Sequence, residues 1–114
     1  MIPPKDWKWF GKPGHFICGD RCAFHLATKV GNYMVSTIGE YKVERNDNAW
    51  SEIGAGRLYE TMVFRADTGI CDVPSCGCGM PIHDGNNVDF APYNTAGAAS
   101  DGHMEMCRKW AVMP

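Results

Sequence analysis

The stretch GHFICGDRCAFH, which spans residues 14–25, carries two imidazoles and two thiols close together in the sequence. Structural zinc sites bind four nitrogen or sulfur ligands in a tetrahedral arrangement. Gly19 permits a tight backbone turn between the two thiols. We therefore predict that this stretch binds one structural zinc ion through His15, Cys18, Cys22 and His25.

A second group of candidate zinc ligands lies far downstream. Two of them, His103 and Cys107, are four residues apart in a predicted helix and would face the same way, as a tetrahedral site requires. Five residues compete for four places, so one is spare, and Cys76 or Cys78 is the expected spare. His83 is interpreted as a surface-loop residue and not as a ligand. The group would bind a second zinc ion through members of the set Cys71, Cys76, Cys78, His103 and Cys107.

The sequence predicts a first helix that supports the zinc site. Asp20 is a good N-cap residue, and the helix after it should run to about Val30 and end at Gly31. In such a helix Cys22 and His25 are three residues apart and share one face. Two ligands of the predicted zinc ion would therefore come from the first helical turn.

A last helix should begin after Asn94 or Thr95, either of which can cap it, and run to about Trp110. Apolar and candidate ligand residues recur in it at helical spacing. Gly97 and Gly102 weaken the helix, so packing or metal must help to hold it. The residues at helical spacing are Ala96, Ala99, His103, Cys107 and Trp110.

Two segments have the pattern of β-strands. Residues 33–43 are rich in β-branched and aromatic side chains, with a bulge expected at Gly39, and residues 57–65 alternate between two faces. We expect these segments to pair in an antiparallel sheet. Residues 66–92 are predicted to be a long loop ordered by metal-bound thiols.

The fold class that follows is α+β: a small antiparallel β-sheet with two helices and long metal-pinned loops, in one zinc-stabilised domain over residues 1–114. Residues 1–14 are interpreted as an extended N-terminal arm whose Trp7, Trp9 and Phe10 pack on the body of the protein. The alternative for these aromatic residues is an exposed patch that binds a partner.

Composition excludes some classes of function. The formal net charge of −2 offers no basic excess for sequence-independent binding of a phosphate backbone. The N-terminus has no signal-peptide pattern and no apolar run is long enough to span a membrane, which indicates a reducing cytosol. Six cysteines in that compartment favour metal ligands, although their even number leaves a disulfide framework open.

An enzymatic role would need a catalytic group at a recognisable spacing. A catalytic zinc usually has a carboxylate nearby as base, but no available carboxylate stands in such a spacing. The candidates are Glu60, Asp72, Asp84 and Asp20. Glu60 is expected at a sheet edge or beside a partner such as Arg57, with a carboxylate in a pocket as the alternative. Cys18 with His15 or His25 could form a thiolate–imidazole pair, but no oxyanion-binding element is visible around it.

Five segments together resemble a family of small uncharacterised proteins from bacteriophages, prophages and related metagenomic sequences. The resemblance covers about residues 7–111 and implies a phage accessory protein that works in the cytoplasm of a bacterial host. It implies no activity and no site residues. The segments are GHFICGDRCAFHLAT, YMVSTIGEY, EIGAGRLYETMVF, YNTAGAA and GHMEMCRKWA.

We therefore expect a zinc-binding accessory protein that acts without catalysis by binding a host protein, such as an inhibitor of a host or defence factor. The alternative is a small metal-dependent enzyme that acts on nucleic acid or nucleotides. An open coordination site with a carboxylate in hydrogen-bond reach would favour the enzyme. A zinc-finger-like nucleic-acid binder is a third class, and it would need a basic face that the composition does not indicate.

Overall fold

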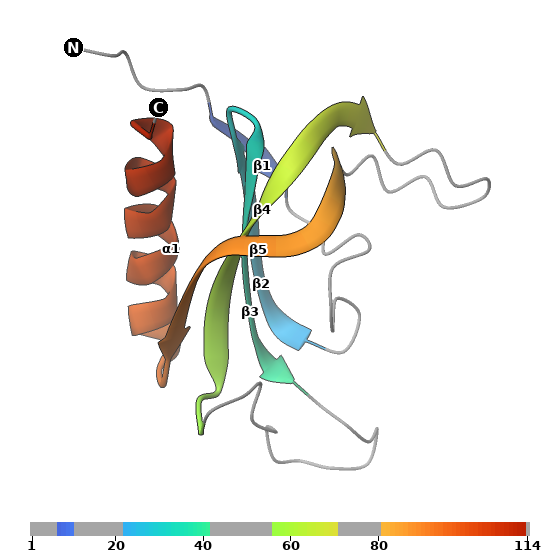
Figure 1. Ribbon diagram of the computed structural model, residues 1–114. Coiled ribbons are helices and arrows are strands. Elements are labelled where there is room, and N and C mark those ends of the chain that lie inside the picture. Colours follow the sequence, from blue (N-terminus) through green and yellow to red (C-terminus); the bar gives the residue numbers. More distant parts are fainter. Residues whose placement is uncertain (1–6, 11–21, 42–55, 71–80, 114) are drawn as a thin grey trace.

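The computed structural model of the chain describes residues 7–10, 22–41, 56–70 and 81–113. Within these residues the chain forms five strands and then one helix (Figure 1). The elements are β1 (Trp7–Phe10), β2 (Cys22–Val30), β3 (Tyr33–Tyr41), β4 (Tyr59–Ile70), β5 (Pro81–Tyr93) and α1 (Ala96–Ala111).

The five strands form one sheet in which sequence order and spatial order are the same, β1-β2-β3-β4-β5, and every neighbouring pair is antiparallel. A two-residue turn, Gly31 and Asn32, joins β2 to β3, and Val30 and Tyr33 on either side of it are paired. Gly31 has a φ of 59°, a conformation that glycine adopts without steric cost. β1 and β5 are consequently the two edge strands of the described sheet.

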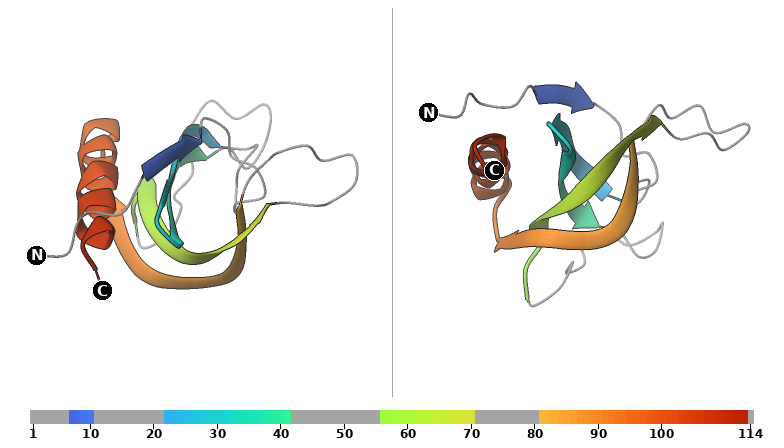
Figure 2. Two further views of the ribbon diagram at one scale, coloured as in Figure 1. Left: turned by 90° about the horizontal axis from the view of Figure 1, so that it is seen from above. Right: turned by 45° about the horizontal axis from the view of Figure 1, so that its top comes forward.

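The sheet is curved, and α1 lies outside the curve against one face (Figure 2). The pairing of β4 with β5 changes register at three places, the first between Val63 and Phe64. Such bulges bend a strand and increase its twist. The two long strands can therefore curl away from the helix, as the right-hand view shows.

Apolar side chains pack on both faces of the sheet. Between the sheet and α1 lies the helix-facing cluster, to which Tyr33, Ala91 and Met113 add partly buried surface. On the opposite face lies the far-face cluster, with Met62 packed against it. The helix-facing cluster is Val30, Val35, Val63, Met106, Cys107, Trp110 and Ala111, and the far-face cluster is Ala27, Met34, Phe64 and Ala66.

Several expectations from the sequence are confirmed. The fold is α+β, the segments around 33–41 and 59–65 pair antiparallel, and the last helix is present. Thr95 is its N-cap, and its Oγ1 accepts a hydrogen bond from the Ala98 N–H at 3.1 Å. The described residues contain no helix that is long and apolar enough to cross a membrane.

The predicted first helix is wrong. Residues 22–30 form β2, which pairs with β3 from Cys22 to Val30 and with β1 over residues 27–30. The sheet buries both of its faces here: Thr28 and Val30 face α1, while Ala27 belongs to the far-face cluster. A strand buried on both faces loses the apolar–polar alternation that identifies strands, so its sequence can be mistaken for a helix.

The predicted loop over residues 66–92 is also wrong in part. β4 continues to Ile70 and β5 begins at Pro81, while residues 71–80 lie outside the described residues. The register shifts in this pair break the regular alternation from which strands are predicted. The bulge expected at Gly39 is absent, because the register of β3 with β2 and β4 passes through this residue without a shift.

Candidate functional site

The centre of the molecule holds a buried polar network around His103, which lies on the face of α1 toward the sheet. The His103 Nε2 is 2.9 Å from the Thr28 Oγ1, and the Nδ1 is 2.7 Å from the Thr37 Oγ1. Thr37 also hydrogen-bonds the Thr61 Oγ1 at 2.6 Å. The three threonines come from β2, β3 and β4, and all four side chains are buried.

The strand register explains why these threonines meet. Thr37 pairs directly with Thr61, and Thr28 lies diagonally across from Thr37 on the same face, two residues along β2 from the residue that pairs with Thr37. Antiparallel pairing places directly opposed side chains within contact distance. The threonines therefore form a row of hydroxyls on the helix-facing side of the sheet, and His103 lies across this row.

The network satisfies a neutral imidazole. One ring nitrogen of neutral histidine donates a hydrogen bond and the other accepts one, so Thr28 and Thr37 must take opposite roles toward His103. Burial, with the nearby His25 adding a smaller electrostatic effect, lowers the pKa of His103 to about 4. His103 is therefore a neutral residue of the core at pH 7.

Cys107 follows His103 by one helical turn and is also buried, within the helix-facing cluster. Burial raises the pKa of its thiol to about 11, although a hydrogen bond with Thr28 and the charge of Arg108 act in the opposite direction. A zinc-bound cysteine is a thiolate. The surroundings of Cys107 in this structure instead favour the protonated thiol.

Trp9 lies on the edge strand β1 at the margin of this network. Its register partner on β2 is Thr28, and its ring contacts the His103 ring edge-on with centroids 5.9 Å apart. The side chain is nevertheless 55% exposed, the largest exposed fraction among the large apolar side chains that the structure describes. Trp9 thus combines a fixed position with a solvent-accessible aromatic face.

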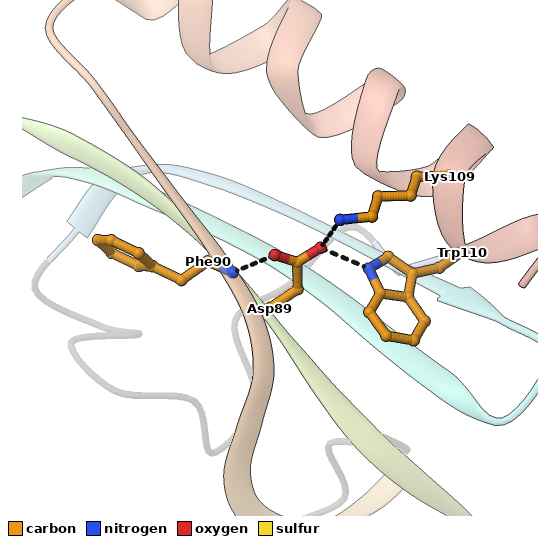
Figure 3. A network of polar contacts seen from close by, with 4 residues as sticks. All are labelled: Asp89, Phe90, Lys109 and Trp110. Atoms are coloured by element: carbon orange, nitrogen blue, oxygen red, sulfur yellow. Dashed lines mark hydrogen bonds and ion pairs between the residues drawn. The ribbon is translucent and has the colours of Figure 1, made fainter.

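A second polar group joins β5 to the end of α1 (Figure 3). The Asp89 Oδ2 accepts hydrogen bonds from the Lys109 Nζ at 2.6 Å and the Trp110 Nε1 at 2.9 Å. The Asp89 Oδ1 accepts from the Phe90 backbone N–H at 2.8 Å. Burial acts to raise the pKa of Asp89, but these hydrogen bonds and the Lys109 charge together lower it.

His25 and Glu60 lie on the sheet face opposite α1, on either side of Ile38. His25 pairs with Ile38 across β2 and β3, and Ile38 pairs with Glu60 across β3 and β4. Burial lowers the pKa of His25 to about 4 and raises the pKa of Glu60. The expected edge position of Glu60 is wrong, because β4 is an interior strand.

Three of the nine predicted zinc ligands have described side chains: His25, His103 and Cys107. His25 lies on the far face, whereas His103 and Cys107 face the sheet from α1, and the described residues contain no group of three or more potential ligands. Cys22 begins β2, so the helical face that should have joined it to His25 does not form. The remaining predicted ligands lie outside the described residues: His15, Cys18, Cys71, Cys76 and Cys78.

Two other features differ from the sequence analysis. His83, expected in a surface loop, lies in β5 opposite Ala66. The threonine row was missed altogether, although Thr37 and Thr61 each occupy a position in an alternating strand segment whose neighbours on that face are apolar. A hydroxyl inside such a face indicates a buried polar partner.

Comparisons with protein-family models, with curated proteins and with solved structures gave no match for this chain.

Proposed function

We propose that this chain is a phage-type accessory protein that acts by binding a host protein in the bacterial cytoplasm, without catalysing a reaction. The observation that carries the proposal is the exposure of Trp9 on the edge strand β1. Tryptophan is among the residue types that contribute most to protein–protein binding energy. Its contact with the buried His103 holds the ring in place, which reduces the conformational entropy lost on binding.

The buried network supports a structural role for the residues that could otherwise carry chemistry. Both nitrogens of His103 are hydrogen-bonded to threonine hydroxyls inside the core. Burial favours the protonated, unreactive thiol of Cys107. Their arrangement is the one expected of groups that fix the packing of α1 on the sheet.

The phage and host setting rests on the family resemblance of the sequence. A protein that works in a bacterial cytoplasm and presents an exposed aromatic side chain on a rigid sheet is suited to bind another protein, for example to inhibit a host or defence factor.

Zinc binding is part of the proposal and rests on the clustered cysteines and histidines of the sequence. The hydrogen bonds of His103 and the burial of Cys107 favour a site built from the other residues of the clusters, with one ion expected and a second allowed. Candidate thiols for such a site are Cys18 in the first cluster and Cys71 in the second.

The binding proposal can be tested by capture from a bacterial lysate with the tagged full-length chain as bait. A host protein should be retained by the wild type and by Phe90→Ala, which removes an exposed aromatic side chain on the opposite edge strand. Trp9→Ala should lose it while remaining folded by circular dichroism. Equal retention by the wild type and Trp9→Ala would show that Trp9 does not carry the binding.

A further inference from the structure

Glu60 carries a half-buried negative charge in the interior strand β4, on the sheet face opposite α1. In the part of the chain that the structure describes, its carboxylate has no hydrogen bond and no ion pair. Burial raises the pKa of this carboxyl, because the charged form is partly removed from water. A charged group that a fold holds without a counterion is a candidate for binding one from outside.

The strand register places an exposed aromatic side chain beside this carboxylate. Glu60 pairs with Pro92 and Met62 pairs with Phe90, so Phe90 is a diagonal neighbour of Glu60 on the same face. Diagonal neighbours in an antiparallel sheet are within reach of aromatic and long side chains. The Phe90 side chain is 45% exposed, and Pro92 is exposed as well. The carboxylate therefore borders an aromatic ring that solvent can reach.

The backbone of Phe90 is fixed by the Asp89 network. The Phe90 N–H donates to the Asp89 Oδ1 at 2.8 Å, while Lys109 and Trp110 hold the Oδ2. Figure 3 shows the Asp89 carboxylate directed toward α1 and the Phe90 side chain directed away from it. A ring on a fixed backbone loses less conformational freedom when a ligand packs against it. The network thus presents Phe90 on the face that carries Glu60.

The described basic side chains do not neutralise this corner of the sheet. Arg57, which the sequence offered as a partner, forms no ion pair with Glu60 in the described structure. Arg65 pairs with Tyr33 and lies on the face toward α1. Lys29 lies on the same face as Glu60, but β3 separates its strand from β4. A negative charge is therefore left for a ligand to neutralise.

A carboxylate next to an aromatic ring suits a guanidinium group better than an ammonium group. Guanidinium is planar and weakly hydrated, so it can stack on a ring and donate two hydrogen bonds to one carboxylate. An ammonium group is a strongly hydrated point charge without a flat face. Met62, which is partly buried between the two strands' exposed residues, offers apolar surface to the aliphatic part of an arginine side chain.

We infer that Glu60, Met62 and Phe90 bind an arginine side chain of a partner protein, with the guanidinium on the Phe90 ring and hydrogen-bonded to the Glu60 carboxylate. This surface lies on the opposite face and at the opposite edge of the sheet from Trp9. The inference therefore goes beyond the proposed function, and the two surfaces can be tested separately.

The test uses the full-length protein and two capped peptides, glycine-arginine-glycine and glycine-citrulline-glycine, which differ in a guanidinium replaced by a neutral urea group. NMR follows the Met62 methyl group and the Phe90 amide. The arginine peptide should shift both signals saturably and bind about tenfold more tightly than the citrulline peptide, as a charge-assisted hydrogen bond predicts. Glu60→Gln should abolish this preference. Glu105→Gln, which removes an exposed carboxylate from α1, should preserve it.

Thermal unfolding provides a second check. Glu60→Gln should melt at the wild-type temperature or above it, because it removes a half-buried charge that has no described counterion. A lower melting temperature would show that the chain itself already pairs this carboxylate, and would overturn the site.

Other results would also overturn the inference: no saturable binding, equal binding of the two peptides, or a preference that survives in Glu60→Gln. Self-association that Glu60→Gln abolishes would identify a second copy as the occupant and exclude a separate partner. Trp9→Ala should bind the arginine peptide as the wild type does, and weaker binding would place the peptide elsewhere. Absence of peptide binding would leave host-protein capture through Trp9 untouched, so the failures of the two proposals are distinguishable.

Discussion

His103 joins α1 to β2 and β3 through the hydroxyl groups of Thr28 and Thr37, so its removal should be costly. We expect His103→Ala to lower the free energy of unfolding by about 3 kcal/mol, because it leaves the buried hydroxyls of Thr28 and Thr37 without their partner and opens a cavity. Urea denaturation measures this change. Met104→Ala, at the neighbouring exposed position, should stay within about 0.5 kcal/mol of the wild type. A loss below about 1 kcal/mol for His103→Ala would show that the network is dispensable.

The same residue should make stability depend on pH. The pKa of His103 is about 4 in the folded protein, below its ordinary value of 6.5, because burial disfavours the charged ring. As the pH falls, His103 is protonated in the unfolded chain before it is protonated in the folded protein. Its contribution to the free energy of unfolding is therefore fully present above pH 6.5 and is lost as the pH is lowered toward 4. The expected loss is about 3 kcal/mol.

Urea denaturation at several pH values checks this expectation. His103→Gln should show a smaller decrease in stability between pH 6.5 and 4 than the wild type, with His25 contributing the remaining dependence because its pKa is also lowered to about 4 by burial. Parallel pH profiles for the two proteins would exclude His103 as the titrating group.

The sequence could place His103 and Cys107 on one face of a helix, because they are four positions apart and residues at this spacing lie on the same side of a helix. It could not identify the partners of His103. Thr28, Thr37 and Thr61 are separated by up to 75 residues from the histidine, and only the strand register brings them together. A histidine within a cysteine-rich sequence therefore suggested a metal ligand, whereas the structure supplies hydroxyl partners.

At the scale of elements, α1 contains two glycines with different surroundings. A Cβ at Gly102 would lie 2.2 Å from the Tyr93 ring, whereas a Cβ at Gly97 would meet nothing within 4 Å. Alanine favours a helix over glycine, so Gly97→Ala should stabilise the protein by about 0.5 kcal/mol. Gly102→Ala should instead destabilise it by about 1 kcal/mol, because the Tyr93 ring must be displaced. Thermal unfolding of both variants checks this, and an equal gain from both would mean that Tyr93 moves without cost.

The contact of β5 with the end of α1 should depend on Asp89. Asp89→Ala removes the acceptor for Lys109, the Trp110 indole and the Phe90 N–H, and we expect a loss of about 2 kcal/mol. Asp101→Ala removes an exposed carboxylate from the same helix and should have little effect. Urea denaturation compares the two. Equal stability of both variants would show that the Asp89 contacts contribute nothing to the fold.

Element prediction from sequence succeeded for α1 and β3 and failed for β2. β3 is buried on both faces, but its β-branched and aromatic residues identify it as a strand. α1 buries one side against the sheet and keeps Glu105 and Arg108 in solvent, so its period is visible. β2 has Thr28 and Val30 on one face and Ala27 on the other, all buried, and its period is hidden. The pairing of β4 with β5 was missed for another reason, since its register shifts interrupt the alternation.

At the scale of the whole molecule, the zinc proposal predicts that purified protein contains the metal. Removal by a chelator at neutral pH should lower the melting temperature sharply, because a structural zinc ion contributes about 10–16 kcal/mol in small peptides and a domain is stable by only about 5–15 kcal/mol. Elemental analysis and thermal unfolding measure both effects. Cys18→Ser should reduce the zinc content, and Cys107→Ser should not, because its thiol is buried beside Thr28.

Metal-free protein whose melting is unchanged by a chelator would remove the zinc proposal. Loss of zinc in Cys107→Ser would leave the zinc proposal standing but contradict the assignment of this thiol to the core.

The α+β class and an antiparallel sheet could be predicted from the sequence, since both follow from local patterns. The number of strands and their order in the described sheet could not, because they depend on β2 and β5, whose periods are irregular or hidden.

The sequential order of the strands has a consequence for synthesis. Each strand of the described sheet pairs with its neighbour in the sequence, so every hairpin can close as soon as its second strand has left the ribosome. α1 follows all five strands in the sequence. It supplies the remaining residues of the helix-facing cluster, among them Met106 and Trp110. In the nascent sheet, Val30, Val35 and Val63 therefore stay exposed to solvent until the helix has been translated. During that interval the polypeptide is at its greatest risk of aggregation with other chains.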